Sequence, residues 1–184
     1  MKNLILISAT LLFITTSIFA QKKKEVPVFD GYHKNITVEL LGSHIAHGIN
    51  YDMRLRKGRM DGIGFRAGIG GVKLSASDGE DAASLGIVTF PIEFNHIVGK
   101  KRHGFIAGLG VLPVYASIKG SGPTFGNSDI EIEGFGIVGG FASLGYRFQP
   151  LKNGFTWQIN YNPLILRGGG FQSYAGISFG IGFK

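Results

Sequence analysis

The sequence predicts an all-β fold, namely an eight-stranded antiparallel up-and-down transmembrane β-barrel. Apolar residues recur at every second position over most of the chain, and the positions between them are small or polar. The first twenty residues also have the layout of an export signal. The 184 residues include 30 glycines and no cysteine, so disulfides and cysteine-ligated metal sites are excluded.

The N-terminal segment, "MKNLILISATLLFITTSIFA", places Lys2 before an apolar run that ends at the small residue Ala20. We interpret it as a secretory signal that is cleaved after Ala20. A retained transmembrane anchor is the alternative, but the run is short and is interrupted by Ser and Thr.

Eight strands are predicted in the rest of the chain, because helical spacing is nearly absent there and clusters of Gly, Asn, Asp and Ser separate the alternating runs. In order they cover 35–43 ("NITVELLGS"), 47–56 ("HGINYDMRLR"), 62–74 ("GIGFRAGIGGVKL"), 85–98 ("LGIVTFPIEFNHIV"), 104–118 ("GFIAGLGVLPVYASI"), 134–148 ("GFGIVGGFASLGYRF"), 155–166 ("FTWQINYNPLIL") and 172–183 ("QSYAGISFGIGF"). Strands of about ten residues can cross a bilayer.

The connections alternate in kind. The turns "KGRMD", "GKKRH" and "QPLKNG" are short, whereas "SASDGEDAAS" (75–84) and "KGSGPTFGNSDIEIE" (119–133) are predicted to be long loops. Short turns at one end, longer loops at the other and an even number of strands are typical of bacterial outer-membrane barrels.

The composition of the two faces indicates which one is inside. In the seventh strand Phe155, Trp157 and Ile159 alternate with Thr156 and Gln158. A water-facing exterior would carry many Lys and Glu residues, and these are rare on the polar faces. The apolar face is therefore predicted to face lipid, around an interior just wide enough to be filled by side chains. A soluble secreted barrel that binds an apolar ligand is the alternative, and it requires the two faces to be reversed.

The sixth strand changes parity along its length. Phe135 and Ile137 lie on one parity, whereas Leu144, Tyr146 and Phe148 lie on the other. Because a bulge inserts one residue and so exchanges the two faces, we predict a bulge near Gly139–Gly140.

Charged residues on the inward faces predict a polar interior. Four neighbouring strands place ionisable groups at similar depth, and buried charges must be paired. The predicted interior ion-pair network consists of Glu39, Asp52, Arg54, Arg66 and Glu93. We interpret it as a plug that blocks the lumen, with a gated ion or proton path as the alternative.

The external loops are acidic. They contain Asp78, Glu80, Asp81, Asp129, Glu131 and Glu133, half of the twelve acidic residues of the chain. Solvation explains such loops, and binding of calcium or of a basic partner is the alternative. The formal charge of +7 does not indicate nucleic-acid binding, because no helix or platform carries the basic residues as a stripe.

An enzyme of this class would need a nucleophile and a base at the outer interface. Ser43, His44 and His47 are the only such group, and no GxSxG context surrounds them. A lipid-modifying outer-membrane enzyme that uses Ser43 with His44 or His47 remains the alternative function. We predict no enzyme activity, no catalytic or metal-ligating residues and no cofactor.

Three segments carry a resemblance to a known family: "PIEFNHIVGKKRHGFIAGLG", "LGYRFQPLKNGFTWQINYNPLI" and the closing "YAGISFGIGF". They resemble small outer-membrane β-barrel domain proteins of Gram-negative bacteria with OmpA/OmpX-like architecture, in a subfamily without assigned function. The resemblance implies location in the cell outer membrane and insertion by the outer-membrane assembly machinery, which reads a final strand that ends in an aromatic residue. Here Phe183 is penultimate and Lys184 follows.

The predicted organisation is a signal peptide (1–20), a periplasmic N-terminal tail (21–34) and the outer-membrane β-barrel (35–184). The predicted function is a structural or surface-interaction role through the external loops of a monomeric barrel with a closed, ion-paired interior. The predicted partners are outer-membrane lipid and the assembly machinery.

Overall fold

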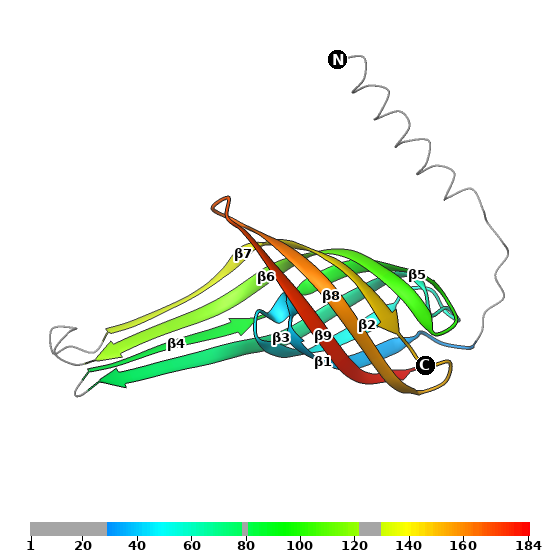
Figure 1. The fold of residues 1–184 in the computed structure, drawn as a ribbon, viewed down its shortest axis with the longest axis horizontal. Coiled ribbons are helices and arrows are strands. Elements are labelled where there is room, and N and C mark those ends of the chain that lie inside the picture. Colours follow the sequence, from blue (N-terminus) through cyan, green and yellow to red (C-terminus); the bar gives the residue numbers. More distant parts are fainter. Residues whose placement is uncertain (1–28, 79–80, 122–129) are drawn as a thin grey trace, which may run out of the picture.

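The computed structural model describes residues 29–78, 81–121 and 130–184, which fold into one closed antiparallel sheet (Figure 1). The strands are β1 (Lys34–Leu41), β2 (His47–Arg54), β3 (Gly62–Asp78), β4 (Asp81–Thr89), β5 (Ile92–Lys100), β6 (His103–Ser121), β7 (Ile130–Phe148), β8 (Gly154–Leu166) and β9 (Phe171–Phe183), with one 3-10 turn, η1 (Gly42–His44). The predicted signal peptide and residues 21–28 of the predicted tail lie outside the described residues. In the part that is described, no helix is both long and apolar enough to span a membrane.

The ring closes because β1 pairs on one side with β2 and on the other with β9. Ile36, for example, lies opposite Tyr51 in β2 and Ile181 in β9. A closed ladder leaves no sheet edge, so the backbone groups of the ring can face lipid without unpaired donors or acceptors.

The strands β4 and β5 occupy a single place in the ring. Both pair with β3 and with β6, and the register is the same on either side of the break, as Gly70↔Thr89 and Ala67↔Ile92 show. The break falls at Phe90–Pro91, where proline has no N–H to give to the ladder. The barrel therefore has eight strands, which confirms the predicted fold class.

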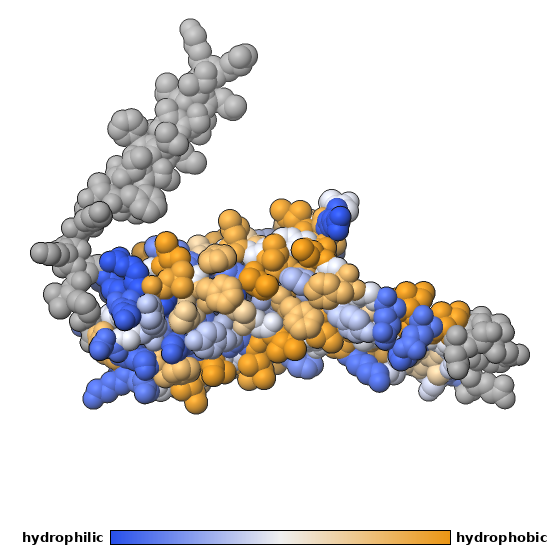
Figure 2. All heavy atoms as spheres, turned by 180° about the vertical axis from the view of Figure 1, so that it is seen from behind, coloured by the Kyte–Doolittle hydropathy of each residue, from blue (hydrophilic) through white to orange (hydrophobic). Residues whose placement is uncertain are grey.

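The outward face of the ring is apolar and the inward face is polar. Ile159 and Phe94 are 50% and 62% exposed, whereas Gln158 and Asn160 are each 2% exposed. Figure 2 shows hydrophobic side chains over the middle of the barrel wall and hydrophilic ones at the end with the short turns. The alternative with reversed faces, a soluble barrel with an apolar lumen, is wrong.

The parity change in β7 results from a bulge. The pairing with β6 passes from Leu112↔Gly139 to Pro113↔Ile137, which leaves Val138 without a partner. The predicted bulge is confirmed, one residue before the expected position. As a consequence Phe141 points inward and is 4% exposed.

The two long loops are shorter than predicted, because residues 75–78, 81–84, 119–121 and 130–133 are in strands, whereas residues 79–80 and 122–129 lie outside the described residues. β3 and β4 extend to Asp78 and Asp81, and β6 and β7 extend to Ser121 and Ile130. Together they form a four-stranded sheet, hereafter the projection, that leaves the ring on one side (Figure 1). The projection comprises residues 72–78, 81–87, 115–121 and 130–138. Its small polar residues suggested loops, but strands outside the membrane also have a solvated polar face.

The end of the predicted tail packs against the barrel. The carbonyl oxygen of Gly31 accepts a hydrogen bond of 2.8 Å from the N–H of Gly58, and His33 is fully buried. The end of the predicted tail is thus attached to the barrel through Gly58 and through Arg54, whose N–H donates to the carbonyl oxygen of His33.

We expect Ile159→Arg to prevent stable membrane insertion, because an arginine on the lipid face near the membrane centre costs about 2–4 kcal/mol. The measurement is the fraction of protein in a fractionated outer membrane whose gel mobility changes on boiling. Ser75→Arg is the matched control, because Ser75 lies in the exposed part of β3 beyond the ring, and it should behave as wild type. Wild-type assembly of Ile159→Arg would show that the face assignment is wrong.

Candidate functional site

The lumen contains a cluster of charged residues centred on Asp52 of β2. Both carboxylate oxygens of Asp52 accept hydrogen bonds from Arg147 of β7, at 2.9 and 3.0 Å. Nη2 of Arg54 donates to the same two oxygens at 2.9 and 2.8 Å. All three side chains are at most 3% exposed. One carboxylate therefore joins the opposite walls of the barrel.

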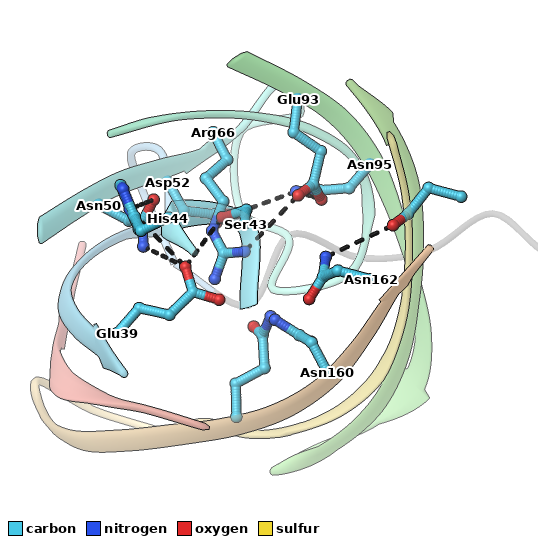
Figure 3. Close-up of polar contacts among 12 residues, drawn as sticks. Glu39, Ser43, His44, Asn50, Asp52, Arg66, Glu93, Asn95, Asn160 and Asn162 are labelled. Atoms are coloured by element: carbon cyan, nitrogen blue, oxygen red, sulfur yellow. Dashed lines mark hydrogen bonds and ion pairs between the residues drawn. The ribbon is translucent and has the colours of Figure 1, made fainter. Parts of the chain in front are cut away.

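A second pair lies next to this cluster. Arg66 of β3 is opposite Glu93 of β5 in the ladder, and Nη1 of Arg66 is 3.5 Å from Oε2 of Glu93. Asn95 links the pair to the first cluster, because its Nδ2 donates to Oε1 of Glu93 at 3.0 Å and to Oδ2 of Asp52 at 3.2 Å. Figure 3 shows these side chains converging on the lumen from neighbouring strands.

The turn η1 lies in the outer mouth of the barrel, where it meets Glu39 of β1. Oε2 of Glu39 accepts hydrogen bonds from Oγ of Ser43 at 3.0 Å and from Nδ2 of Asn50 at 2.8 Å, and it is 3.7 Å from Nε2 of His44 (Figure 3). Glu39 and His44 are fully buried. The first external loop is thus folded inward as part of the plug.

Glycine makes the room for these large polar side chains. A Cβ at Gly68 would lie 2.7 Å from Cε1 of His44, and a Cβ at Gly48 or Gly64 would collide with His44 or Arg54. The barrel is narrow, so the positions facing each long side chain must be almost empty. This explains why glycine alternates with apolar residues in several strands.

The buried charges of the lumen balance within the described residues. The carboxylates are Glu39, Asp52 and Glu93, and the guanidinium groups are Arg54, Arg66 and Arg147. The structure places all five residues of the predicted interior network in the lumen. Asp52, Arg54, Arg66 and Glu93 are joined through Asn95, whereas Glu39 contacts Ser43, Asn50 and His44 instead. Arg147 is not in the predicted network, although the outward parity of Tyr146 and Phe148 on either side of it places residue 147 inside.

Above the charged layer the mouth is filled by apolar side chains. Leu112, Phe141 and Leu164 are buried, and Ile45 and Tyr174 pack against them. The cavity left between this mouth core and η1 has a volume of about 10 Å³, which is the least that one water molecule needs. The outer end of the lumen is therefore closed.

Of the three residues considered for catalysis, Ser43 and His44 both lie at Glu39 inside the barrel, and His47 lies apart from them. Ser43 donates to Glu39, and His44 contacts Asn50 and Thr89 inside the barrel. His47 is exposed on the outward face of β2. Neither Ser43 nor His44 reaches the lipid interface, because they are 5% and 0% exposed. No group of three or more His, Asp or Glu side chains in the described segments could hold a metal ion.

The acidic residues of the predicted loops lie on the projection. Glu131 forms an ion pair with Lys119, and Glu133 accepts a hydrogen bond of 3.3 Å from Oγ of Ser117. A hydrogen bond from Tyr115 lowers the pKa of Glu133, so this carboxylate stays ionised in neutral solution. Asp78 and Asp81 face each other at the end of the β3–β4 hairpin. Glu80 and Asp129 lie outside the described residues.

Comparison with known proteins identifies the fold. No family model and no curated relative matches the chain. Among solved structures, Ail, the attachment invasion locus protein of Yersinia pestis, in complex with the heparin analogue sucrose octasulfate, aligns over 83% of this chain and 96% of its own with 10% identity and a TM-score of 0.50. The N-terminal β-barrel domain of Pseudomonas aeruginosa OprF has 10% identity, coverage of 83% and 96%, and a TM-score of 0.48.

The likeness to Ail is at the level of the fold. It agrees with the closed eight-stranded ring and with the outward apolar band, which is stable only in lipid. The chain thus has the fold of a small eight-stranded outer-membrane β-barrel.

Proposed function

We propose that this protein is a non-enzymatic surface-interaction protein: a monomeric barrel, closed by its ion-paired interior, that anchors a recognition surface outside the cell. The observation that carries the proposal is the projection, four strands that continue beyond the lipid-facing wall. In the described residues, β3 has no paired strand on the β2 side after Gly71. β7 has none on the β8 side before Val138, whose carbonyl oxygen accepts a hydrogen bond from the N–H of Arg167.

A closed interior fits an anchor better than a pore. The charged layer around Asp52 crosses the lumen, and the mouth core with η1 covers its outer end. Buried ion pairs of this kind contribute little net stability, but removing one partner is costly. The network therefore favours one register of the strands and one position of η1.

Electrostatics indicates the charge of the partner. The described part of the projection carries Asp78, Asp81, Glu131 and Glu133 against Lys73 and Lys119, which gives 2 − 4 = −2, whereas the whole chain is +7. Such a surface attracts cations. We therefore propose a cationic ligand for this chain. This ligand differs from the sucrose octasulfate in the Ail structure, which is an anion.

We also propose that the barrel contacts outer-membrane lipid along its apolar wall and that the assembly machinery inserts it. Phe183 of β9 is paired to Lys34 of β1. The aromatic residue that such machinery reads thus lies at the closing seam of the ring.

Asp52→Ala should lower the free energy of unfolding by about 3–5 kcal/mol, because it leaves Arg54 and Arg147 buried without their carboxylate. The measurement is urea unfolding in lipid vesicles, followed by gel mobility of unboiled samples. Asp61→Ala is the control, because Asp61 pairs with Arg59 in a partly exposed position and should contribute at most about 1 kcal/mol. Equal costs for the two variants would argue against a charge-paired plug.

The wild-type barrel should give no steady ion conductance in a planar bilayer, because both the charged layer and the mouth core block the lumen. Insertion is verified by the change of gel mobility in protein recovered from the same preparation. Stable, stepwise openings of the wild type would contradict the closed interior and support the narrow-pore alternative.

The projection should bind a cationic probe. A 14-residue peptide of alternating Ser and Lys is titrated against the barrel in zwitterionic nanodiscs and against a shortened variant in which Asn-Gly replaces residues 74–85 and 116–134. These cuts join the paired positions Lys73↔Gly86 and Tyr115↔Phe135 with two-residue hairpin turns. We expect affinity to fall at least about tenfold on shortening and to fall with salt. Equal binding to both barrels would refute the proposal.

A further inference from the structure

The strands of the projection exchange their apolar and polar faces where they leave the membrane. In β3 the outward residue Ile69 is apolar, whereas the later outward residues Lys73 and Ser75 are polar. Beyond Gly71 the apolar residues of β3 occupy the positions that face the lumen within the ring. Leu74 is one of them, and it is 59% exposed. We call this second surface, which continues the lumen-facing side beyond the mouth, the inner face of the projection.

The inner face carries a continuous aliphatic row across all four strands. Leu74 pairs with Leu85, Leu85 with Ile118, and Ile118 with Ile132. Ile118 and Ile132 are 49% and 61% exposed. Directly paired side chains on one face lie about 4.5–5.5 Å apart at Cβ, so these four form one apolar strip.

The opposite face of the same strands is polar. The row adjacent to the aliphatic one consists of Ser75, Ser84, Lys119 and Glu131, each paired with the next. A lipid-facing surface would not carry this row, so the projection lies outside the bilayer. Lipid tails therefore do not cover the aliphatic strip.

No other part of the barrel among the described residues covers the strip, and a neighbouring copy does not reach it either. The opposite walls end lower, at η1 and at the β8–β9 turn near residue 169, and the mouth core reaches up only to Ile87 and Val138. A second copy in the same membrane would have its inner face directed over its own mouth. Two such faces could meet only if the two barrels overlapped. A sheet with one apolar face is normally completed by a second layer, and no described segment of this chain supplies that layer.

The charges around the strip specify the chemistry of this molecule. Asp78 and Asp81 have the same parity as Leu74 and Leu85 and are paired at the far end of the inner face, beyond Ala76 and Ala83. A ligand that covers the strip thus meets two carboxylates at its outer end. Their complement is a segment with an apolar side and basic residues.

We propose that the inner face is a docking site for a cationic amphipathic segment of a partner protein, whose apolar side chains cover the row Leu74–Leu85–Ile118–Ile132 and whose Lys or Arg residues reach Asp78 and Asp81. The inference rests on the proposed function of the projection as a recognition surface and adds where and through which chemistry the partner binds.

The test uses the absence of native cysteine. Ala83→Cys on the inner face and Ser84→Cys on the outer face each receive an environment-sensitive fluorophore, in zwitterionic nanodiscs. The probes are two 14-residue peptides of equal charge, one of Leu and Lys in a helical amphipathic pattern and one with Ser in place of Leu. Empty nanodiscs measure binding to lipid.

We expect the Leu/Lys peptide to bind at least about tenfold more tightly than the Ser/Lys peptide, as burial of two or more aliphatic side chains implies. The label at residue 83 should change and the label at residue 84 should not. Ile118→Ser combined with Ile132→Ser should abolish the tenfold difference without changing the gel mobility of the folded barrel. Ser75→Thr combined with Ser117→Thr on the outer face is the matched control and should retain it.

The outcomes separate the two proposals. Equal affinity for the two peptides, with loss of both on shortening the projection, would overturn the inner-face site and leave the recognition surface standing. An equal response of the two labels, or retention of the difference in the Ile118→Ser, Ile132→Ser variant, would likewise overturn the site. Failure of both peptides to bind would overturn the site together with the cationic recognition surface.

Discussion

The closed hydrogen-bond ring is the constraint on which the rest of the structure depends. Lipid offers no partner for a backbone N–H or C=O, so the last strand must pair with the first, as Phe183 does with Lys34. Closure with only eight strands makes the lumen narrow. Long inward side chains can then reach the opposite wall, as Arg147 reaches Asp52, so the size and charge of inward residues are restricted.

The composition of the interior follows from that restriction. Three carboxylates and three guanidinium groups fill the lumen, and each needs both a counter-charge and free space. Gly64 and Gly68 provide space opposite Arg54 and His44. The high glycine content and the buried charges are therefore two aspects of the same packing problem. An apolar lumen of equal volume would not need the glycines but would not fix the register of the strands through specific pairs.

The period-two pattern was sufficient to predict the ring, its faces and the bulge, because in a membrane barrel parity alone decides which solvent a side chain meets. Parity also placed Glu39, Asp52, Arg54, Arg66 and Glu93 in the lumen, but it could not indicate which of them would form pairs, because pairing across the lumen depends on strand tilt. Arg147 is 95 positions from Asp52, and nothing local to either residue indicates their contact. The inward fold of η1 was equally hidden, since it depends on positive φ angles at Leu41 and Ile45 and not on a residue pattern.

The error in the loops has a physical origin that bears on function. Alternation continues from Ile69 to Leu74 in β3, but the apolar parity changes from odd to even without a bulge, since Gly70↔Thr89 and Leu74↔Leu85 belong to one register. In a strand that stayed within lipid, this change would bury lysine and serine in the bilayer. The strand can change its apolar parity only if its surroundings change as well. Within the ring its outer side meets lipid and its inner side meets protein, whereas in the projection its outer side meets water and its inner side needs an apolar layer. A change of apolar parity in an unbulged strand thus marks the point where the strand leaves the membrane, and it indicates that the inner side of the projection is built to be covered.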